Sequence, residues 1–276
     1  MPDKKNFRTR NFWKIVQEII EKSDIVLEVL DARMPELSRN FEVEKLVNDS
    51  GKKLILVLNK ADLVSKPTLE RVGKALRDKG FLAVFVDSSY KAPPPKKLIG
   101  MVFGALRDIA KPVRFDGKVG KWSVGVIGYP NTGKSSLINL ITRRKKVIVS
   151  RKAGTTRGVQ WVSFGDNIRI LDSPGVIPLT ADDPVRFGLL GVRNPEKMRN
   201  LEFTAEAIVD IFLHQNRPAL ERVFGITIPN DGLISPDSVV ALIAFSKGFV
   251  KKGGLPDEYR THLVIVRAWN DGTLRL

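Results

Sequence analysis

A glycine-rich segment, Gly128-Tyr-Pro-Asn-Thr-Gly133-Lys134-Ser135, constrains the fold of this chain more than any other feature of its sequence. An apolar run at residues 123–127 precedes the segment, and apolar residues at helical spacing follow it from Lys134 to Thr142. Between a buried strand and a helix, such glycines allow backbone N–H groups to turn toward an anion at the positive end of the helix. The pattern therefore predicts a strand, a phosphate-binding loop and a helix in direct succession, and it favours this interpretation over a chance glycine-rich turn.

The other hydrophobic patterns place this unit inside a larger α/β domain. Apolar runs predict six strands, at residues 24–31, 54–58, 82–86, 123–127, 160–164 and 168–171. Helical periodicity predicts helices at residues 11–22, 68–79, 97–109 and 134–142. Strands that alternate with helices predict a three-layer α/β fold with a mostly parallel sheet, the architecture of a P-loop NTPase.

The pattern changes after Pro174. Strong strand patterns give way to helical periodicity at residues 205–213, 236–249 and 258–269. We therefore expect a nucleotide-binding domain at residues 1–178 and a smaller, mainly helical C-terminal domain at residues 179–276.

A second motif, Asn59-Lys60-Ala61-Asp62, follows the apolar run at residues 54–58. A carboxylate such as that of Asp62 can accept hydrogen bonds from both N1–H and the exocyclic amine of guanine, whereas adenine has no such pair of donors on that edge. Alone, an asparagine and an aspartate at a strand end are more often turn and helix-capping residues than a base-reading motif. Together with the phosphate-binding loop they favour guanine recognition, so we expect the chain to bind GTP and GDP through Asn59, Lys60 and Asp62.

The phosphate-binding loop supplies most of the remaining predicted nucleotide contacts. Lys134 is expected to reach the β- and γ-phosphates, and the Ser135 hydroxyl is expected to ligate Mg²⁺. The predicted nucleotide-binding residues of this segment are Gly128, Asn131, Thr132, Gly133, Lys134, Ser135 and Ser136. Ser88 and Ser89 follow the strand at residues 82–86 and are expected to close on the guanine, mainly because of their position.

Two further segments match the nucleotide-sensing switches of GTPases. Asp172-Ser-Pro-Gly175 ends the strand at residues 168–171, so we expect Asp172 to hold Mg²⁺ through water and the Gly175 N–H to sense the γ-phosphate, although a Pro-Gly turn is the simpler alternative. Thr155 or Thr156 would complete the Mg²⁺ coordination; the sequence does not distinguish them. The catalytic candidates are Lys134, Asn131, Thr155, Thr156 and Gly175.

The order of these motifs is circularly permuted. The base-reading motif precedes the phosphate-binding loop, whereas ordinary GTPases have the reverse order. The fold tolerates the change because all these loops lie at the carboxyl edge of one sheet. In the permuted order, the switch at residues 172–175 leads directly into the C-terminal domain, to which loss of the γ-phosphate could be transmitted.

With this motif order, the sequence resembles the circularly permuted GTPases of the YlqF/YawG type, the RbgA-like ribosome-biogenesis family. Asp31-Ala-Arg33-Met-Pro35 looks like the Asp-Ala-Arg-x-Pro signature of that family, and the tail at residues 253–272 is similar to its helical C-terminal end. The resemblance implies GTP hydrolysis during assembly of the large ribosomal subunit. From the residues alone, Asp31 to Pro35 is only a strand end that enters a turn.

Two departures bear on catalysis. Bacterial members of the family carry an N-terminal histidine that is proposed to assist hydrolysis, but here no histidine precedes His214. Ras-like enzymes place a glutamine after the Asp-x-x-Gly motif, where this chain has Val176 and Ile177, so we expect slow hydrolysis without a partner. The resemblance to cation-dependent GTPases suggests that Asn131 helps to bind K⁺, with a simple turn residue as the alternative.

The charge of the chain favours a polyanionic partner. The formal net charge is +16, and basic clusters occur at residues 4–10, at residues 143–152 and at Lys247, Lys251 and Lys252. Such an excess attracts nucleic acid through counterion release, although many basic proteins are simply well solvated. Together with the resemblance to the ribosome-biogenesis family, this charge leads us to expect rRNA of the large ribosomal subunit as the partner, without specificity for DNA.

Composition also limits the compartment and the kinds of site. The chain lacks cysteine, which excludes disulfides and thiolate metal sites, and it has no apolar run of the roughly 18 to 20 residues that span a bilayer. We expect a cytoplasmic monomer that does not bind membranes. Two other functions remain open: a GTP-dependent switch that acts on a protein partner without RNA, and a binding module that has lost catalysis.

Overall fold

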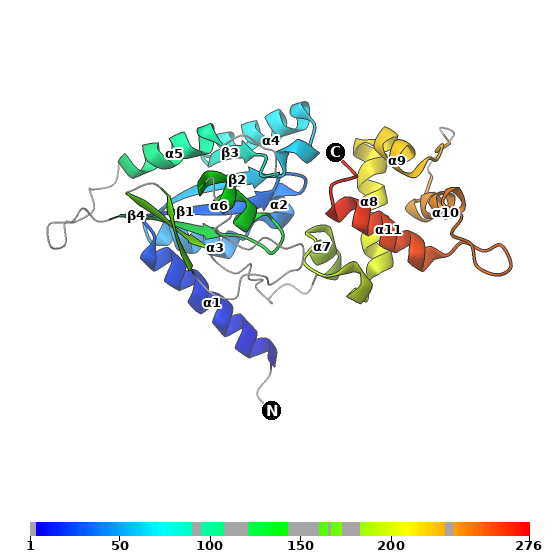
Figure 1. Cartoon of the computed structure of the whole chain (residues 1–276), viewed down its shortest axis with the longest axis horizontal. Helices are drawn as coiled ribbons and strands as arrows, with labels where there is room; N and C mark the ends of the chain where they lie inside the picture. Colours follow the sequence, from blue (N-terminus) through cyan, green and yellow to red (C-terminus); the bar gives the residue numbers. More distant parts are fainter. Residues whose placement is uncertain are drawn as a thin grey trace. The chain divides into compact units, whose positions relative to one another are not determined.

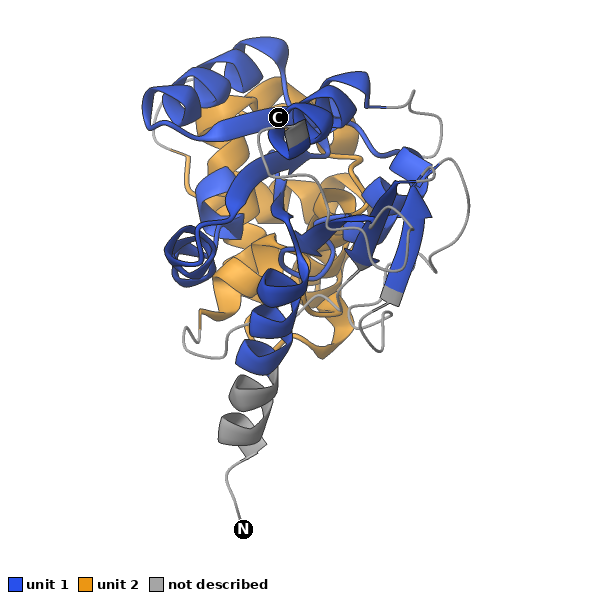
Figure 2. Ribbon diagram, turned by 90° about the vertical axis from the view of Figure 1, so that its left-hand side faces the viewer, with its two compact units in different colours: residues 1–182 blue, residues 183–276 orange. Residues whose placement is uncertain are grey.

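The computed structural model describes residues 4–89, 95–107, 121–142, 160–164, 167–172, 183–229 and 234–276, with backbone alone for residues 4–11, 160 and 172 (Figure 1). The chain divides into two compact units, residues 1–182 and residues 183–276 (Figure 2). The domain boundary that we expect after residue 178 lies outside the described residues.

A six-stranded sheet forms the centre of the first unit, in the order β3-β2-β1-β4-β6-β5. Its strands are β1 (Ile25–Asp31), β2 (Lys53–Asn59), β3 (Leu82–Val86), β4 (Trp122–Ile127), β5 (Gln160–Phe164) and β6 (Ile168–Asp172). All neighbouring strands are parallel except β5 and β6, which form an antiparallel pair. The predicted α/β class with a mostly parallel sheet is confirmed.

Helices cover both faces of this sheet (Figure 1). On one face, α5 (Lys96–Arg107) and α6 (Lys134–Thr142) pack on Ile25, Leu27 and Val29 of β1. On the other face lie α1 (Lys4–Lys22), α3 (Phe41–Asp49) and α4 (Lys66–Asp78). Because successive side chains of a strand point to opposite faces, a strand covered on both sides is apolar throughout, and every residue of β1 except Glu28 and Asp31 is apolar.

Two short helices between β1 and β2 were not predicted. They are α2 (Pro35–Ser38) and α3, whose N-cap residue Asn40 accepts a hydrogen bond from the Val43 N–H at 3.2 Å. A one-turn 3₁₀ helix, η1 (Ala61–Leu63), follows β2. Because β1 and β2 are parallel, α2 and α3 return the chain from the carboxyl edge of the sheet to its amino edge, where β2 begins.

The second unit is helical. It contains α7 (Pro184–Leu189), η2 (Pro195–Lys197), α8 (Leu201–Gln215), α9 (Arg217–Phe224), α10 (Pro236–Ser246) and α11 (Glu258–Asn270). Trp269 of α11 is fully buried, meets the Phe212 ring edge-on at 6.0 Å, and donates from Nε1 to the Leu189 carbonyl at 2.7 Å. Helix α10 ends three residues before the predicted Phe249, because Gly248 adopts a φ of 67° and stops it.

None of the helices described in the two units is long and apolar enough to cross a bilayer.

Candidate nucleotide-binding site

The loops that carry the predicted site follow parallel strands at the carboxyl edge of the sheet. Asn59 is the last residue of β2, Gly128 follows β4, and Ser88 follows β3. These three strands are parallel to β1, so their carboxyl ends lie together. The fold alone therefore brings to one place loops that are far apart in the sequence.

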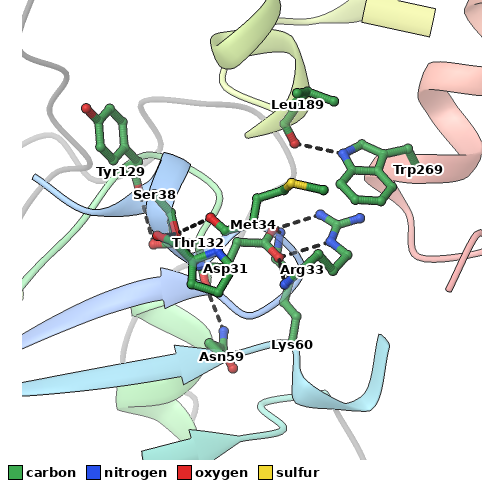
Figure 3. Close-up of polar contacts among 11 residues, drawn as sticks. Asp31, Arg33, Met34, Ser38, Asn59, Lys60, Tyr129, Thr132, Leu189 and Trp269 are labelled. Carbon is green, nitrogen blue, oxygen red and sulfur yellow. Dashed lines mark hydrogen bonds and ion pairs between the residues drawn. The ribbon is translucent and has the colours of Figure 1, made fainter. Parts of the chain in front are cut away.

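Asn59 joins the base-reading motif to the phosphate-binding loop. Its side chain is 1% exposed, and its Nδ2 donates a hydrogen bond to the Thr132 carbonyl at 2.7 Å (Figure 3). A Cβ atom on Gly133 would lie 2.1 Å from Asn59 Nδ2 and 3.5 Å from Ser88 Oγ. Three of the predicted loops thus converge on Gly133, where a side chain has no room.

The phosphate-binding loop has a backbone that only certain residues tolerate. Gly128 and Gly133 have φ values of 142° and 94°, and a Cβ on Gly128 would lie 2.4 Å from the Val29 carbonyl oxygen. Asn131 adopts a φ of 64°, a left-handed conformation that costs energy for residues other than glycine and that clusters at functional sites. This geometry directs the loop across the N-terminus of α6.

Lys134 occupies the centre of the loop. Its side chain is buried, and its Nζ donates hydrogen bonds to the carbonyls of Gly128 and Tyr129, each at 2.8 Å. The ammonium group therefore lies inside the curve of the loop, next to the positive end of α6. A positive charge and inward backbone N–H groups at a helix start are the chemistry that binds phosphate. Ser135 and Ser136, both half-buried, follow in the first turn of that helix.

A buried ion pair joins the base-reading motif to the end of β1. Lys60 adopts a φ of 60°, and its Nζ lies 2.8 Å from Asp31 Oδ2 at the end of β1 (Figure 3). Burial lowers the pKa of Lys60, although the Asp31 charge opposes this effect. Asp62, two residues further on, lies in the first turn of η1 and is exposed. Its carboxylate is therefore accessible at the edge of the sheet.

Arg33 completes this cluster. Its Nε and Nη2 donate to the two carboxylate oxygens of Asp31 at 3.0 and 2.8 Å, and its backbone N–H donates to Oδ1 at 3.1 Å. Burial alone would raise the pKa of Asp31, but the charges of Lys60 and Arg33 outweigh it and hold that pKa well below its ordinary range. Sequence reasoning gave Asp31 and Arg33 no role; their only signal was the Asp-Ala-Arg-x-Pro resemblance.

The last predicted base contact follows β3. The backbone N–H of Ser89 donates to Asp87 Oδ1 at 2.7 Å, which forms a turn at the end of the strand. Ser88 is half-buried and is the serine whose hydroxyl lies nearest to Gly133, whereas Ser89 is exposed. Of the two predicted serines, the structure therefore brings Ser88 to the phosphate-binding loop.

The comparison with known families decides what this arrangement is. Residues 123–221 match the family model described as "50S ribosome-binding GTPase". The fold is that of the crystal structure of GNP-bound YlqF from T. maritima, with a TM-score of 0.61 over 96% of this chain and 95% of that one, at 22% sequence identity. The fold is therefore that of a circularly permuted P-loop GTPase.

Curated relatives of this chain carry names that agree with this fold. An uncharacterized GTP-binding protein of Methanocaldococcus jannaschii is 36% identical over 261 residues, which are 95% of this chain and 65% of the relative. Nucleolar GTP-binding protein 2 of Cryptococcus neoformans var. grubii is 30% identical over 271 residues, which are 96% of this chain and 38% of the relative. The chain thus spans less than two thirds of the length of these relatives.

Part of the predicted nucleotide site lies outside the described residues. This holds for Thr155, Thr156 and Gly175, and for the basic cluster at residues 143–152. The backbone of Asp172 is described: it ends β6 in register with Val126 of β4, the strand that leads into the phosphate-binding loop. This register brings the start of the predicted second switch beside the loop.

Proposed function

We propose that this chain binds GTP and GDP at the carboxyl edge of the sheet and hydrolyses GTP. The hydrogen bond from Asn59 Nδ2 to the Thr132 carbonyl is the observation that carries the proposal, because it ties the motif for the base to the loop for the phosphates. Asp62 reads guanine, Lys134 leaves the carbonyls of Gly128 and Tyr129 to meet the β- and γ-phosphates, and Ser88 borders the base. Asn131, Thr132 and Ser136 complete the loop around the nucleotide.

Mg²⁺ fits the residues available beside the phosphates. It prefers hard oxygen ligands and retains part of its water shell. The Ser135 hydroxyl in the first turn of α6 and the carboxylate of Asp172 at the end of β6 offer such oxygens, with Thr155 or Thr156 as a further ligand. Bound there, the ion would neutralise charge on the β- and γ-phosphates. Asn131, already in a left-handed conformation, would help to hold K⁺ nearby.

Base selectivity provides the direct test of the site. Calorimetric titration of the wild type should detect GTP and GDP and no comparable binding of ATP. Asp62→Asn should weaken GDP binding and improve binding of xanthosine diphosphate, because the carbonyl of xanthine accepts a hydrogen bond from an amide where guanine presents an amine. The matched control is Asp49→Asn, an exposed carboxylate of α3. Equal affinity for GTP and ATP would refute the assignment.

The biological role that we propose is assembly of the large ribosomal subunit. It is supported by the family description, which names the 50S ribosome, by the nucleolar relative and by the net charge of +16. The GTP-bound protein, as a cytoplasmic monomer without specificity for DNA, would bind rRNA on the subunit and leave after hydrolysis. Hydrolysis would be slow in isolation because Val176 and Ile177 replace the water-orienting glutamine.

Co-sedimentation separates this role from its alternatives. With a non-hydrolysable GTP analogue, the protein should migrate with isolated large subunits, less so with GDP and less at high salt. If it fails to migrate with subunits even at low salt, a switch that acts on a protein partner is the better interpretation. Multiple-turnover phosphate release that disappears in Lys134→Ala would exclude a binding module without catalysis. Identical turnover in sodium and potassium buffers, with and without subunits, would refute the K⁺ site.

A further inference from the structure

A buried charged cluster at the end of β1 has no place in the predicted nucleotide contacts. Asp31 is 1% exposed and Arg33 5% exposed, and the Asp31 carboxylate accepts four hydrogen bonds, three from Arg33 and one from Lys60 (Figure 3). Buried ion pairs are weak evidence for stability, because the loss of hydration offsets much of the attraction. The cluster therefore calls for an explanation other than the packing of the sheet.

Its contacts lead to the base-reading motif. Asp31 forms the ion pair with Lys60, and the Ala32 N–H donates to the Asn59 carbonyl at 2.8 Å. The side chain of Asp31 and the backbone of Ala32 therefore both bind the end of β2. Asn59 in turn holds Thr132 of the phosphate-binding loop. A continuous set of contacts runs from Arg33 through Asp31 to both halves of the nucleotide site.

Lys60 is the residue that most needs such support. Its left-handed backbone, at a φ of 60°, is unfavourable for a residue with a Cβ. The same backbone sets the direction in which the chain enters η1 and presents Asp62. An anchor on the Lys60 ammonium group therefore fixes the position of the carboxylate that reads the base.

We infer that Asp31 and Arg33 are positioning residues for guanine recognition: Arg33 orients the Asp31 carboxylate, which anchors Lys60 and so aims Asp62 at the base. The inference rests on the proposed function, because it assigns a role within that same site. Neither Asp31 nor Arg33 needs to touch the nucleotide.

Removal of the anchor should release Lys60, because of the charges around it. Arg33 and Lys60 repel each other, and Asp31 is the carboxylate that lies between them. Asp31→Asn removes the negative charge that pairs with both Arg33 and Lys60, so the repulsion between these two cations should move Lys60 out of its position. The carboxylate of Asp62 then loses its fixed direction, so the hydrogen bond to the exocyclic amine of guanine suffers first.

Inosine diphosphate isolates this effect, because its base lacks the exocyclic amine. A hydrogen bond to a charged group contributes about 1.5–3 kcal/mol, so the wild type should prefer GDP to inosine diphosphate by about 10- to 150-fold. Asp31→Asn should lower this preference to within about 3-fold, chiefly through weaker GDP binding. A merely structural defect would weaken both nucleotides equally and leave the ratio unchanged.

A double-mutant cycle tests whether the effect passes through Lys60. Lys60→Met removes the ammonium group but keeps much of the side-chain volume, so Asp31→Asn should cost little further GDP affinity in that background. Arg33→Lys keeps the positive charge but loses the bidentate hydrogen bonds to the Asp31 carboxylate. Its preference for GDP over inosine diphosphate should lie between those of the wild type and Asp31→Asn. The control is Glu18→Gln, which removes a carboxylate from an exposed pair with Lys22 and should change nothing.

Thermal unfolding without nucleotide identifies which variants fold. If Asp31→Asn does not fold, Arg33→Lys with and without Lys60→Met completes the same cycle. An unchanged preference for GDP over inosine diphosphate in the folded variants, or fully additive losses in the cycle, would overturn the inference. A wild-type protein that binds no GDP would instead overturn the proposed function, so the two failures are distinguishable.

Discussion

Replacement of Gly133 by alanine tests the convergence of loops on which the nucleotide site depends. The new Cβ would lie 2.1 Å from Asn59 Nδ2, where ordinary contacts begin at 3.4 Å, so Asn59 or the loop must shift by roughly 1 Å. Gly133 also has a φ of 94°, which a residue with a Cβ rarely adopts. The substitution therefore strains the backbone and displaces a hydrogen-bonded side chain at the same time.

The size of the effect depends on these two contributions. A left-handed backbone costs about 1–2 kcal/mol with a Cβ present, and loss of the hydrogen bond from Asn59 to Thr132 costs about 1 kcal/mol. The free protein can relieve the strain by moving the loop, but a bound nucleotide requires the original conformation. We therefore expect Gly133→Ala to weaken GDP binding by about 30- to 150-fold, measured by calorimetric titration.

Gly104→Ala is the matched control. Gly104 lies within α5, and a Cβ there would meet no atom within 4 Å. Alanine should stabilise this helix by about 0.5–1 kcal/mol and raise the unfolding temperature without changing GDP affinity. If Gly133→Ala binds GDP as tightly as the wild type while the control behaves as expected, the close approach of Asn59 to Gly133 does not exist.

Three further substitutions test packing and burial within each of the two units. Gly125→Ala would place a Cβ 2.4 Å from Ser23 Oγ, where β4 packs against the end of α1. The substitution should destabilise the protein by about 1–3 kcal/mol in chemical unfolding. An unchanged unfolding midpoint would contradict this packing. Trp269→Phe removes the hydrogen bond to the Leu189 carbonyl and should cost about 1–3 kcal/mol, with unchanged stability as the contrary result. Burial, together with the charge of Glu44, raises the pKa of Glu28 above its ordinary value of 4.5, so folding takes up a proton. The stability that this carboxyl supports is present below pH 4.5 and is lost as the pH rises through the raised pKa. Glu28→Gln should therefore gain stability over the wild type with rising pH in thermal unfolding, and a difference independent of pH would refute this.

The parts of the fold that the sequence predicts well are those where two signals coincide. At β4 and α6, an apolar run, a glycine motif and helical periodicity agree on the same boundaries, and the structure follows them closely. The segment after β1 has no such agreement. Helix α2 has four residues and α3 nine, which are too few turns for the apolar period to stand out. Gly248 is a typical helix-ending residue, but the apolar residues beyond it led the sequence pattern to predict a longer helix than α10.

The candidate site shows a similar division. Motifs within one loop, such as that from Gly128 to Ser135, predict local chemistry because neighbours in sequence are neighbours in space. The cluster of Asp31, Arg33 and Lys60 depends instead on the pairing of β1 with β2, which places Asp31 opposite Asn59. No periodicity in the sequence specifies which strands are adjacent, so the partner of Asp31 could be found only from the sheet order.

The position of β1 between β2 and β4 has a consequence for how the protein matures during translation. A nascent chain that has emerged through β3 already carries the residues proposed to read guanine. The strand that leads to the phosphate-binding loop pairs on the opposite side of β1 and is made later. Contacts across such sequence separations form slowly, because the intervening chain must be ordered first. Nucleotide can therefore stabilise only a nearly finished domain, and its capture would mark the end of folding on the translating ribosome.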